Sequence, residues 1–297
     1  MKFNRPVLIG VVCAAVIAAI GLATWARLAH HWSTDLTTAT SRGESYLRER
    51  GEQMDPTMLL ILDFLARRFD IEWMHAAASR VRTPAPAIPC AGDTASGADC
   101  EGPPARSSIR RLVDPSVRVT PAELADLANT FGNTMDSFTH LALHCRTVPL
   151  PADYPQRVEH WLDPAGGDYD PPHAALALQW AIEQDCLDAT REAIGRLRAR
   201  AIEELVRFAD GVPRDQPIEA VAMLGYLGAR DRVQREWIET IVAAQRENGG
   251  WGDRPDEPSN DHTTILALWV LLEQTRPARP GAWIPQSPSV DGAAAPS

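Results

Sequence analysis

Three segments of the chain combine aspartate and histidine side chains at or near the expected start of an apolar helix. The candidate acid–base residues are Asp136, His140, Asp170, His173, Asp261 and His262. Carboxyl and imidazole groups are common general acids and bases, because proteins can tune their pKa values toward neutral pH. Parallel helices that begin at one mouth would bring these groups to one pocket, where helix N-termini favour an anionic ligand. The competing interpretation is that each aspartate only caps its helix and each histidine is only packed or hydrogen-bonded.

The pair His140 and His144 has a spacing that suits a metal ion. The two residues stand one helical turn apart, so both imidazoles lie on one face of a helix. The sequence predicts no cofactor. If the chain binds one, these two histidines favour a divalent metal ion. The chain has no Gly-x-Ser-x-Gly elbow, phosphate-binding loop or His-Glu-x-x-His motif. Hydrolases and nucleotide-binding proteins that depend on those motifs are therefore excluded.

Tryptophans gather in the C-terminal half of the chain and offer a possible binding surface. Trp180, Trp251 and Trp269 are the candidate ligand-binding residues. Aromatic side chains that line a concave cavity suit a small apolar molecule, a lipid, a glycan or a peptide. The alternative is that these side chains pack the junctions between helices, which is the usual place of a buried aromatic residue.

A series of helices must position these residues. Helices are expected over 32–50, 57–69, 71–81, 121–131, 135–145, 154–162, 173–186, 188–210, 218–227, 230–245 and 262–273. The motif Leu-Ala-Leu occurs at 141–143, 176–178 and 266–268, each time a few residues after an aspartate and a histidine. We interpret these copies as degenerate repeats of one helical hairpin. No strand-like alternation of comparable length occurs, so the predicted fold class is all-α.

The segment Gln245-Arg246-Glu247-Asn248-Gly249-Gly250-Trp251-Gly252 precedes an acidic loop and the helix that begins at His262. Its Gln-x-x-x-Gly-x-Trp spacing resembles the QW repeat of squalene and hopene cyclases. The longer run GGWGDRPDEPSNDHTT is similar to the repeat of protein prenyltransferases. This resemblance, specific over 241–272, implies an α/α toroid, partial or small, built from helical hairpins. The physical reading agrees, because a glutamine can bond orphan carbonyls, glycines allow a sharp turn, and tryptophan covers the junction.

The catalytic motifs of these families are missing from the chain. In prenyltransferases the repeat supplies a zinc-ligand histidine, and His262 is one residue out of step with that position. The Asp-x-Cys ligands of prenyltransferases and the Asp-x-Asp-Asp acid of squalene cyclases have no counterpart here. The resemblance therefore implies an architecture and leaves the reaction open.

The stretch from Pro6 to Ala26 carries no charge and is long enough to cross a bilayer as a helix. A cleaved signal peptide is the alternative, but the apolar run exceeds the length of about 7–15 residues that is usual for the apolar core of such a peptide. Lys2 and Arg5 precede the stretch, which places the N-terminus in the cytoplasm by the positive-inside rule. We expect a single-pass protein of the inner membrane whose C-terminal domain is periplasmic.

Four cysteines follow the predicted anchor, an even number that suits a compartment where disulfides form. Cys90 and Cys100 bracket a small loop and are expected to pair. Cys145 and Cys186 each follow an apolar helical run and form the second predicted pair, which requires Cα atoms within about 7 Å. Metal binding by these thiols is the alternative, although no Cys-x-x-Cys pair is present to support it.

The predicted organisation is a cytoplasmic stub and anchor over 1–29, a helical stalk over 30–54, and a toroid-like domain over 55–275. A disulfide-containing loop interrupts that domain at 83–120, and a tail rich in Pro, Ala and Ser over 276–297 is expected to be disordered. The net charge of −10, without a basic patch, disfavours a nucleic-acid partner. We expect a membrane-anchored ligand-binding or scaffold module. The alternatives are an enzyme with an Asp/His site at the mouth of the toroid and a structural subunit of an envelope complex.

Overall fold

The computed structural model describes residues 32–82, 109–113, 135–166, 169–211, 214–254, 256–279 and 281–285. Within these ranges the chain is helical, and its one β feature is an isolated bridge between Trp251 and Asn260. The all-α prediction is confirmed for this part of the chain. The helix predicted over 121–131, the Cys90–Cys100 pair and most of the insertion at 83–120 lie outside the described residues.

The predicted helices are present in the described ranges, with ends that differ by a few residues. The first covers residues 32–50, and the later elements are η1 (Gly51–Gln53), α2 (Pro56–Phe69), α3 (Glu72–Arg82), η2 (Arg110–Leu112), α6 (Met135–His144), α7 (Tyr154–Trp161), α8 (Pro171–Glu183), α9 (Glu192–Ala209), α10 (Asp215–Tyr226), η3 (Arg230–Arg232), α11 (Arg235–Ala243) and α12 (Asp261–Thr275). The helix predicted over 230–245 is divided, because Val233 and Gln234 are extended and separate η3 from α11.

Side-chain caps fix the starts of three helices. Asp55 accepts a hydrogen bond from the Thr57 amide at the start of α2, with Pro56 in the first turn as expected. Asp170 caps α8 in the same way. At α12 the cap is Asn260, two residues before the predicted start at His262, and it accepts from the Thr263 amide at 2.9 Å. These caps set the positions of the side chains in each first turn.

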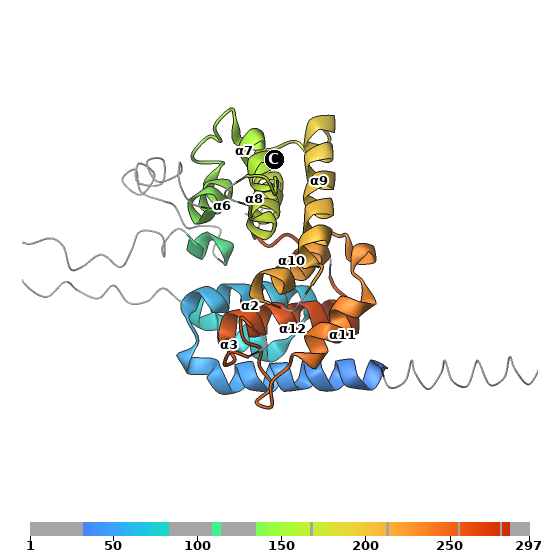
Figure 1. Cartoon of the computed structure of the whole chain (residues 1–297). Coiled ribbons are helices and arrows are strands. Elements are labelled where there is room, and N and C mark those ends of the chain that lie inside the picture. Colours follow the sequence, from blue (N-terminus) through green and yellow to red (C-terminus); the bar gives the residue numbers. More distant parts are fainter. Residues whose placement is uncertain are drawn as a thin grey trace, which may run out of the picture.

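The even-numbered helices pack against one another. Helix α6 contacts α8, α8 contacts α10, α10 contacts α12, and α12 contacts α2. The odd-numbered helices cover them, with α3 on α2, α7 and α9 on α8, and α11 on α12. In Figure 1, α6 to α9 form the upper part, α2, α3, α11 and α12 form the lower part, and α10 lies between the two.

Burial separates the central helices from the covering ones. In α12 every residue from Thr263 to Glu273 is buried, so this helix is surrounded on all sides. Helix α9 buries one stripe that includes Ile194, Leu197, Ala201 and Leu205, and it exposes its opposite face. The apolar pattern of each helix therefore matches its place in the array.

The helix over 32–50 packs against the domain and does not stand free as the predicted stalk. Leu36 and Leu47 on this helix are buried. The Arg50 guanidinium pairs with Asp261 at 3.0 Å, and the Ala39 carbonyl accepts from Gln245 at 2.8 Å. The prediction of a separate stalk is wrong for these residues, because the helix carries its own apolar face.

The Gln245-to-Trp251 turn joins α11 to the N-terminal helix. The Gln245 amide donates to the Ala39 carbonyl and to the Gly249 carbonyl, as expected of a glutamine at a helix end. Gly249 has φ 89°, and a Cβ there would lie 2.5 Å from the Arg42 carbonyl oxygen, so glycine is required. Trp251 is 1% exposed and donates from Nε1 to the Ile241 carbonyl. The ring of Trp251, a predicted ligand-binding residue, therefore packs the junction.

Residues 276–279 and 281–285 form a packed segment, although the tail from 276 onward was expected to be disordered. Trp283 and Ile284 are buried, at 5% and 0% exposure. The Arg67 guanidinium donates to the carbonyls of Ala282 and Trp283, at 3.2 and 2.8 Å. Two large apolar side chains in an otherwise small and proline-rich segment are enough to dock it. Residues 286–297 lie outside the described part of the chain.

The predicted membrane segment over 6–26 also lies outside the described residues. Among the helices that the structure describes, none combines the length and apolar character needed to cross a bilayer.

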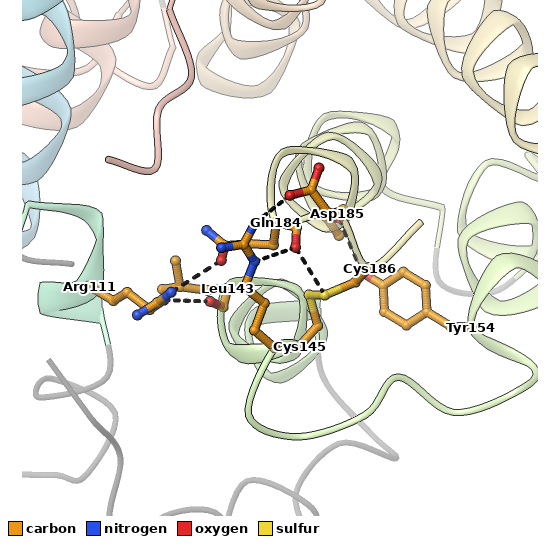
Figure 2. Close-up of a disulfide and its surroundings, with 9 residues drawn as sticks. Arg111, Leu143, Cys145, Tyr154, Gln184, Asp185 and Cys186 are labelled. Atoms are coloured by element: carbon orange, nitrogen blue, oxygen red, sulfur yellow. Dashed lines mark hydrogen bonds and ion pairs between the residues drawn. A yellow bond between two sulfur atoms is a disulfide. The ribbon is translucent and has the colours of Figure 1, made fainter. Parts of the chain in front are cut away.

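Cys145 and Cys186 form a disulfide, as predicted, with Cα atoms 6.1 Å apart. Both cysteines stand in turns just beyond the ends of α6 and α8 and can approach more closely than the helix axes. Figure 2 shows the bridge beside Gln184 and Asp185. The Arg111 side chain nearby donates to the Leu143 carbonyl and the Gln184 side chain, both at 3.2 Å.

Replacing both cysteines by alanine is expected to lower the free energy of unfolding by roughly 2–4 kcal/mol, because the bridge restricts the unfolded chain. The bridged residues are 41 positions apart, so the closed loop is long. Urea unfolding of the full chain measures the difference. Dithiothreitol should lower the free energy of unfolding of the native chain more than that of the double variant. Equal sensitivity of both proteins to the reductant would contradict this role.

Candidate active site

A cavity of about 170 Å³ lies between the even-numbered helices. Its walls include stripes of side chains spaced three or four residues apart: His173, Leu176 and Trp180 from α8; Glu219 and Met223 from α10; His262, Leu266 and Trp269 from α12. This spacing puts each successive side chain one turn further along the same helix face. Helices α2 and α6 complete the wall with residues that include Met58, Thr139 and His140.

The cavity has a polar mouth and an aromatic base. The side chains of His173 and His262, in the first turns of their helices, are 32% and 40% exposed. Trp180 and Trp269, further along the same helices, are at most 5% exposed. The helices therefore present their N-terminal ends to solvent and their later turns to the interior.

Trp283 closes the base of the cavity. Its ring stacks on Phe64 with centroids 4.7 Å apart and meets the rings of Trp180, Tyr226 and Trp269 edge to face at 5.6–5.7 Å. These four partners come from α2, α8, α10 and α12. One residue of the C-terminal segment thus contacts four of the helices that surround the cavity.

Asp170 both caps α8 and holds His173. Its carboxylate accepts from the His173 amide at 3.3 Å and lies 3.0 Å from the imidazole Nδ1. When Nδ1 carries the proton that binds Asp170, the other nitrogen, Nε2, is the proton-accepting atom of the ring. Capping and orientation of the imidazole are therefore combined in one carboxylate.

Asp215 holds His262 in the same manner. The Asp215 carboxylate lies 2.8 Å from His262 Nδ1 and 2.7 Å from the Thr263 hydroxyl, which also lies 2.7 Å from Asp253. Burial alone lowers the pKa of His262, but the hydrogen bond and charge of Asp215 outweigh it and raise the pKa above its ordinary value. Burial raises the pKa of Asp215, yet the bonds from His262 and Thr263 leave that pKa lowered.

Glu219 lies on the next turn of α10 after Asp215. The residue is 6% exposed, and its Oε1 lies 4.0 Å from His173 Nε2. Burial raises the pKa of the Glu219 carboxyl, and the charges of His173 and His262 oppose that rise only in part. The two carboxylate-bound histidines therefore share their part of the cavity wall with a buried carboxyl group.

The structure brings together four of the six predicted acid–base residues. His140, His173 and His262 line the cavity, and Asp170 binds His173. Trp180 and Trp269 also line it, as proposed for ligand contact.

Asp261 does not belong to this group. Its carboxylate pairs with Arg50 at 3.0 Å, away from the cavity lining, so the structure does not bring this predicted catalytic residue to the cavity. The Asp136 side chain lies outside the described residues. His144, the second histidine of the proposed metal pair, is 2% exposed and is absent from the cavity lining. Within the described part of the chain, no group of three or more His, Cys, Asp or Glu side chains has the arrangement of a metal site.

Sequence reasoning missed Asp215, Glu219 and Trp283. Asp215 begins α10 as Asp170 precedes α8, but no histidine follows it and the helix was expected to begin only at Ile218. Glu219 is a single acid within the otherwise apolar run from Ile218 to Leu224, and this isolation was a usable signal. Trp283 belongs to a segment whose composition is typical of disorder, which concealed it.

Asp215→Asn is expected to lower the pKa of His262, because the neutral amide no longer stabilises the imidazolium. NMR titration of the histidine ring protons measures this pKa. Asp261→Asn is the matched control, since Asp261 is adjacent in sequence but pairs with Arg50. An unchanged His262 pKa in Asp215→Asn, or an equal fall in both variants, would refute the pairing.

The same pair fixes how stability depends on pH. The raised pKa of His262 stabilises the fold below its ordinary value of 6.5, and this contribution is lost as pH rises through the folded-state pKa. The lowered pKa of Asp215 stabilises the fold above 3.8, a contribution lost as pH falls through its folded-state pKa. The difference in melting temperature between the native chain and Asp215→Asn should therefore be greatest between these two values.

Comparison with known proteins places the chain in no group: no family model, no curated protein and no solved structure matches it.

Proposed function

We propose that the domain is an enzyme that carries out general acid–base chemistry on a small molecule at the mouth of the cavity. The observation that carries this proposal is the pair of carboxylate-bound histidines, Asp170–His173 and Asp215–His262, on one cavity wall with buried Glu219. A binding or scaffold module has no need to orient two imidazoles in this way. A cavity with convergent polar groups and perturbed pKa values is typical of an active site.

The two histidines can take complementary roles. His262, whose pKa is raised, is the proton donor, because its imidazolium persists closer to neutral pH. His173 is the proton acceptor, since Asp170 lies 3.0 Å from Nδ1 and the second nitrogen, Nε2, faces Glu219 at 4.0 Å. Asp170 and Asp215 act as positioning residues that fix the ring orientation and stabilise the charged form. The reaction class that follows is a proton transfer, elimination or addition of water on a bound molecule.

We also propose that the helices form a small α/α toroid around this cavity. The contacts of α6 with α8, of α8 with α10, of α10 with α12 and of α12 with α2 support a ring of inner helices covered by α3, α7, α9 and α11. The disulfide supports a location in an oxidising compartment such as the periplasm, where the predicted anchor over 6–26 would hold the domain at the membrane.

The enzyme proposal is tested by incubating the full chain with a protein-free extract of small metabolites and comparing compounds by mass spectrometry. The matched protein is His173→Gln/His262→Gln, which keeps polar side chains of similar size. One compound should disappear and a related mass should appear only with the native chain. Equal profiles for both proteins across a broad extract would reject the enzyme proposal in favour of a binding module.

A further inference from the structure

Glu219 is a buried carboxylate that lacks a hydrogen-bond partner among the described residues. It is 6% exposed, and the imidazole nitrogen His173 Nε2 lies 4.0 Å from Oε1, beyond hydrogen-bond distance. Its side chain lines the cavity. Buried carboxylates are almost always paired, because loss of hydration is costly when nothing replaces it. The missing partner of Glu219 therefore belongs in the cavity.

The charged groups around the cavity indicate whether that partner is a cation or an anion. Glu219 and the three histidines are the titratable residues of the lining, and neither Lys nor Arg contributes to it among the described residues. The N-terminal ends of α8 and α12, which were expected to favour an anion, are already capped by Asp170 and Asn260. The imidazoles of His173 and His262 are likewise bound to Asp170 and Asp215. Glu219 is the acid of the described lining left to attract a ligand, and it attracts a cation; the Nε1 donors of Trp180 and Trp283 are neutral and unpaired there as well.

The base of the cavity suits the rest of such a ligand. Trp180, Trp269 and Trp283 line it beyond the polar mouth, together with Leu176 and Met223. Indole rings bind apolar groups and also attract organic cations through the electron-rich ring face. The cavity volume of about 170 Å³ limits the bound portion to a small group.

We infer that the cavity binds a small organic amine, with its ammonium group paired with the Glu219 carboxylate and its apolar body against the tryptophans at the base. This inference rests on the proposed active site and names the class of molecule on which it acts. Burial raises the pKa of Glu219, and a bound ammonium would restore the charged form by supplying a charge-assisted hydrogen bond.

Three probes that share one ring test the inference: benzylammonium, benzyl alcohol and benzoate. Their binding to the full chain is measured by titration calorimetry at neutral pH. Benzylammonium should bind at least about tenfold more tightly than either of the others, the expected worth of one charge-assisted hydrogen bond. Equal or tighter binding of the alcohol or of benzoate would overturn the inference, and this comparison requires no variant.

A variant then assigns the effect to one carboxylate. Glu219→Gln should weaken the affinity for benzylammonium by about tenfold or more and leave the affinity for benzyl alcohol unchanged. Glu204→Gln is the control, because Glu204 is equally buried but binds Arg207 and lies outside the cavity lining. An unchanged affinity of Glu219→Gln for benzylammonium would also overturn the inference. If Glu219→Gln does not fold, Glu219→Asp takes its place. This variant withdraws the carboxylate by one carbon, so it should lose affinity for benzylammonium, by less than the about tenfold expected of Glu219→Gln.

Failure of this inference and failure of the enzyme proposal are distinguishable. Selective binding of benzylammonium without turnover of any metabolite would leave the ligand class standing and reject catalysis. If the chain does not bind benzylammonium but turns over an anionic or neutral metabolite, the ligand class is rejected and the enzyme proposal stands.

Discussion

Glu273→Ala is expected to lower the free energy of unfolding by about 3–5 kcal/mol, the usual cost of removing one partner of a buried ion pair. Glu273 Oε1 lies 2.6 Å from Arg68 Nε and accepts from Trp269 Nε1 at 3.1 Å. The side chains of Arg68 and Glu273 are 10% and 4% exposed. The substitution would leave the Arg68 charge buried without its carboxylate.

The size of this effect follows from the elements that the pair connects. Arg68 belongs to α2 and Glu273 to α12, and Arg68 also donates to the Gly225 carbonyl of α10 at 3.0 Å. A Cβ at Gly225 would lie 3.0 Å from Glu273 Cγ, so α10 and α12 approach closely here. Three helices that line the cavity are thus joined at one buried cluster.

Denaturant unfolding of the full chain, followed by circular dichroism, measures the loss. Glu192→Ala is the matched control, because Glu192 pairs with Arg196 on the exposed face of α9, where both side chains are more than half exposed. The free energy of unfolding of Glu192→Ala should differ little from that of the native chain, since solvent screens exposed ion pairs. A Glu273→Ala protein as stable as Glu192→Ala would refute the importance of the buried pair.

His262→Gln is expected to reduce turnover of the metabolite identified with the native chain by about 10²- to 10⁴-fold, the usual contribution of a general acid or base. Glutamine keeps a polar side chain at the mouth but cannot transfer a proton. The loss should appear in kcat more than in KM, because the imidazole is proposed to act in the proton-transfer step.

The control for this prediction is His160→Gln, a substitution of an exposed histidine in α7 that is absent from the cavity lining. Its kcat should equal that of the native chain. Full activity of His262→Gln would remove the role of proton donor from His262. A rise in KM with unchanged kcat would instead assign the residue to binding.

The helices could be predicted from sequence because each carries its own apolar pattern and a local start signal. Asp55 followed by Pro56 marked the start of α2, and Asp170 followed by Pro171 marked that of α8. These signals depend on neighbouring residues and therefore appear in the sequence itself. The break between η3 and α11 lacks such a signal, since neither Val233 nor Gln234 excludes a helix.

The site could be predicted only in part, because its members come from helices far apart in the chain. His173 and His262 were recognised as residues near helix starts, and the packing of α8, α10 and α12 brings them to one cavity. Asp261 met the same local criterion but lies outside the cavity lining, since Arg50 from a distant helix binds it. Which carboxylate meets which imidazole depends on tertiary packing, and Asp215 reaches His262 across a separation of 47 residues.

The Trp283 ring at the base of the cavity has a consequence for the order of assembly. Every helix that lines the cavity precedes residue 283, so a chain emerging from the ribosome presents the walls before the base. Until Trp283 docks, Phe64, Trp180, Tyr226 and Trp269 lack their shared partner and leave apolar surface open to water. The closed base of the pocket is thus an event of late maturation, completed by the segment that the sequence marked as least structured.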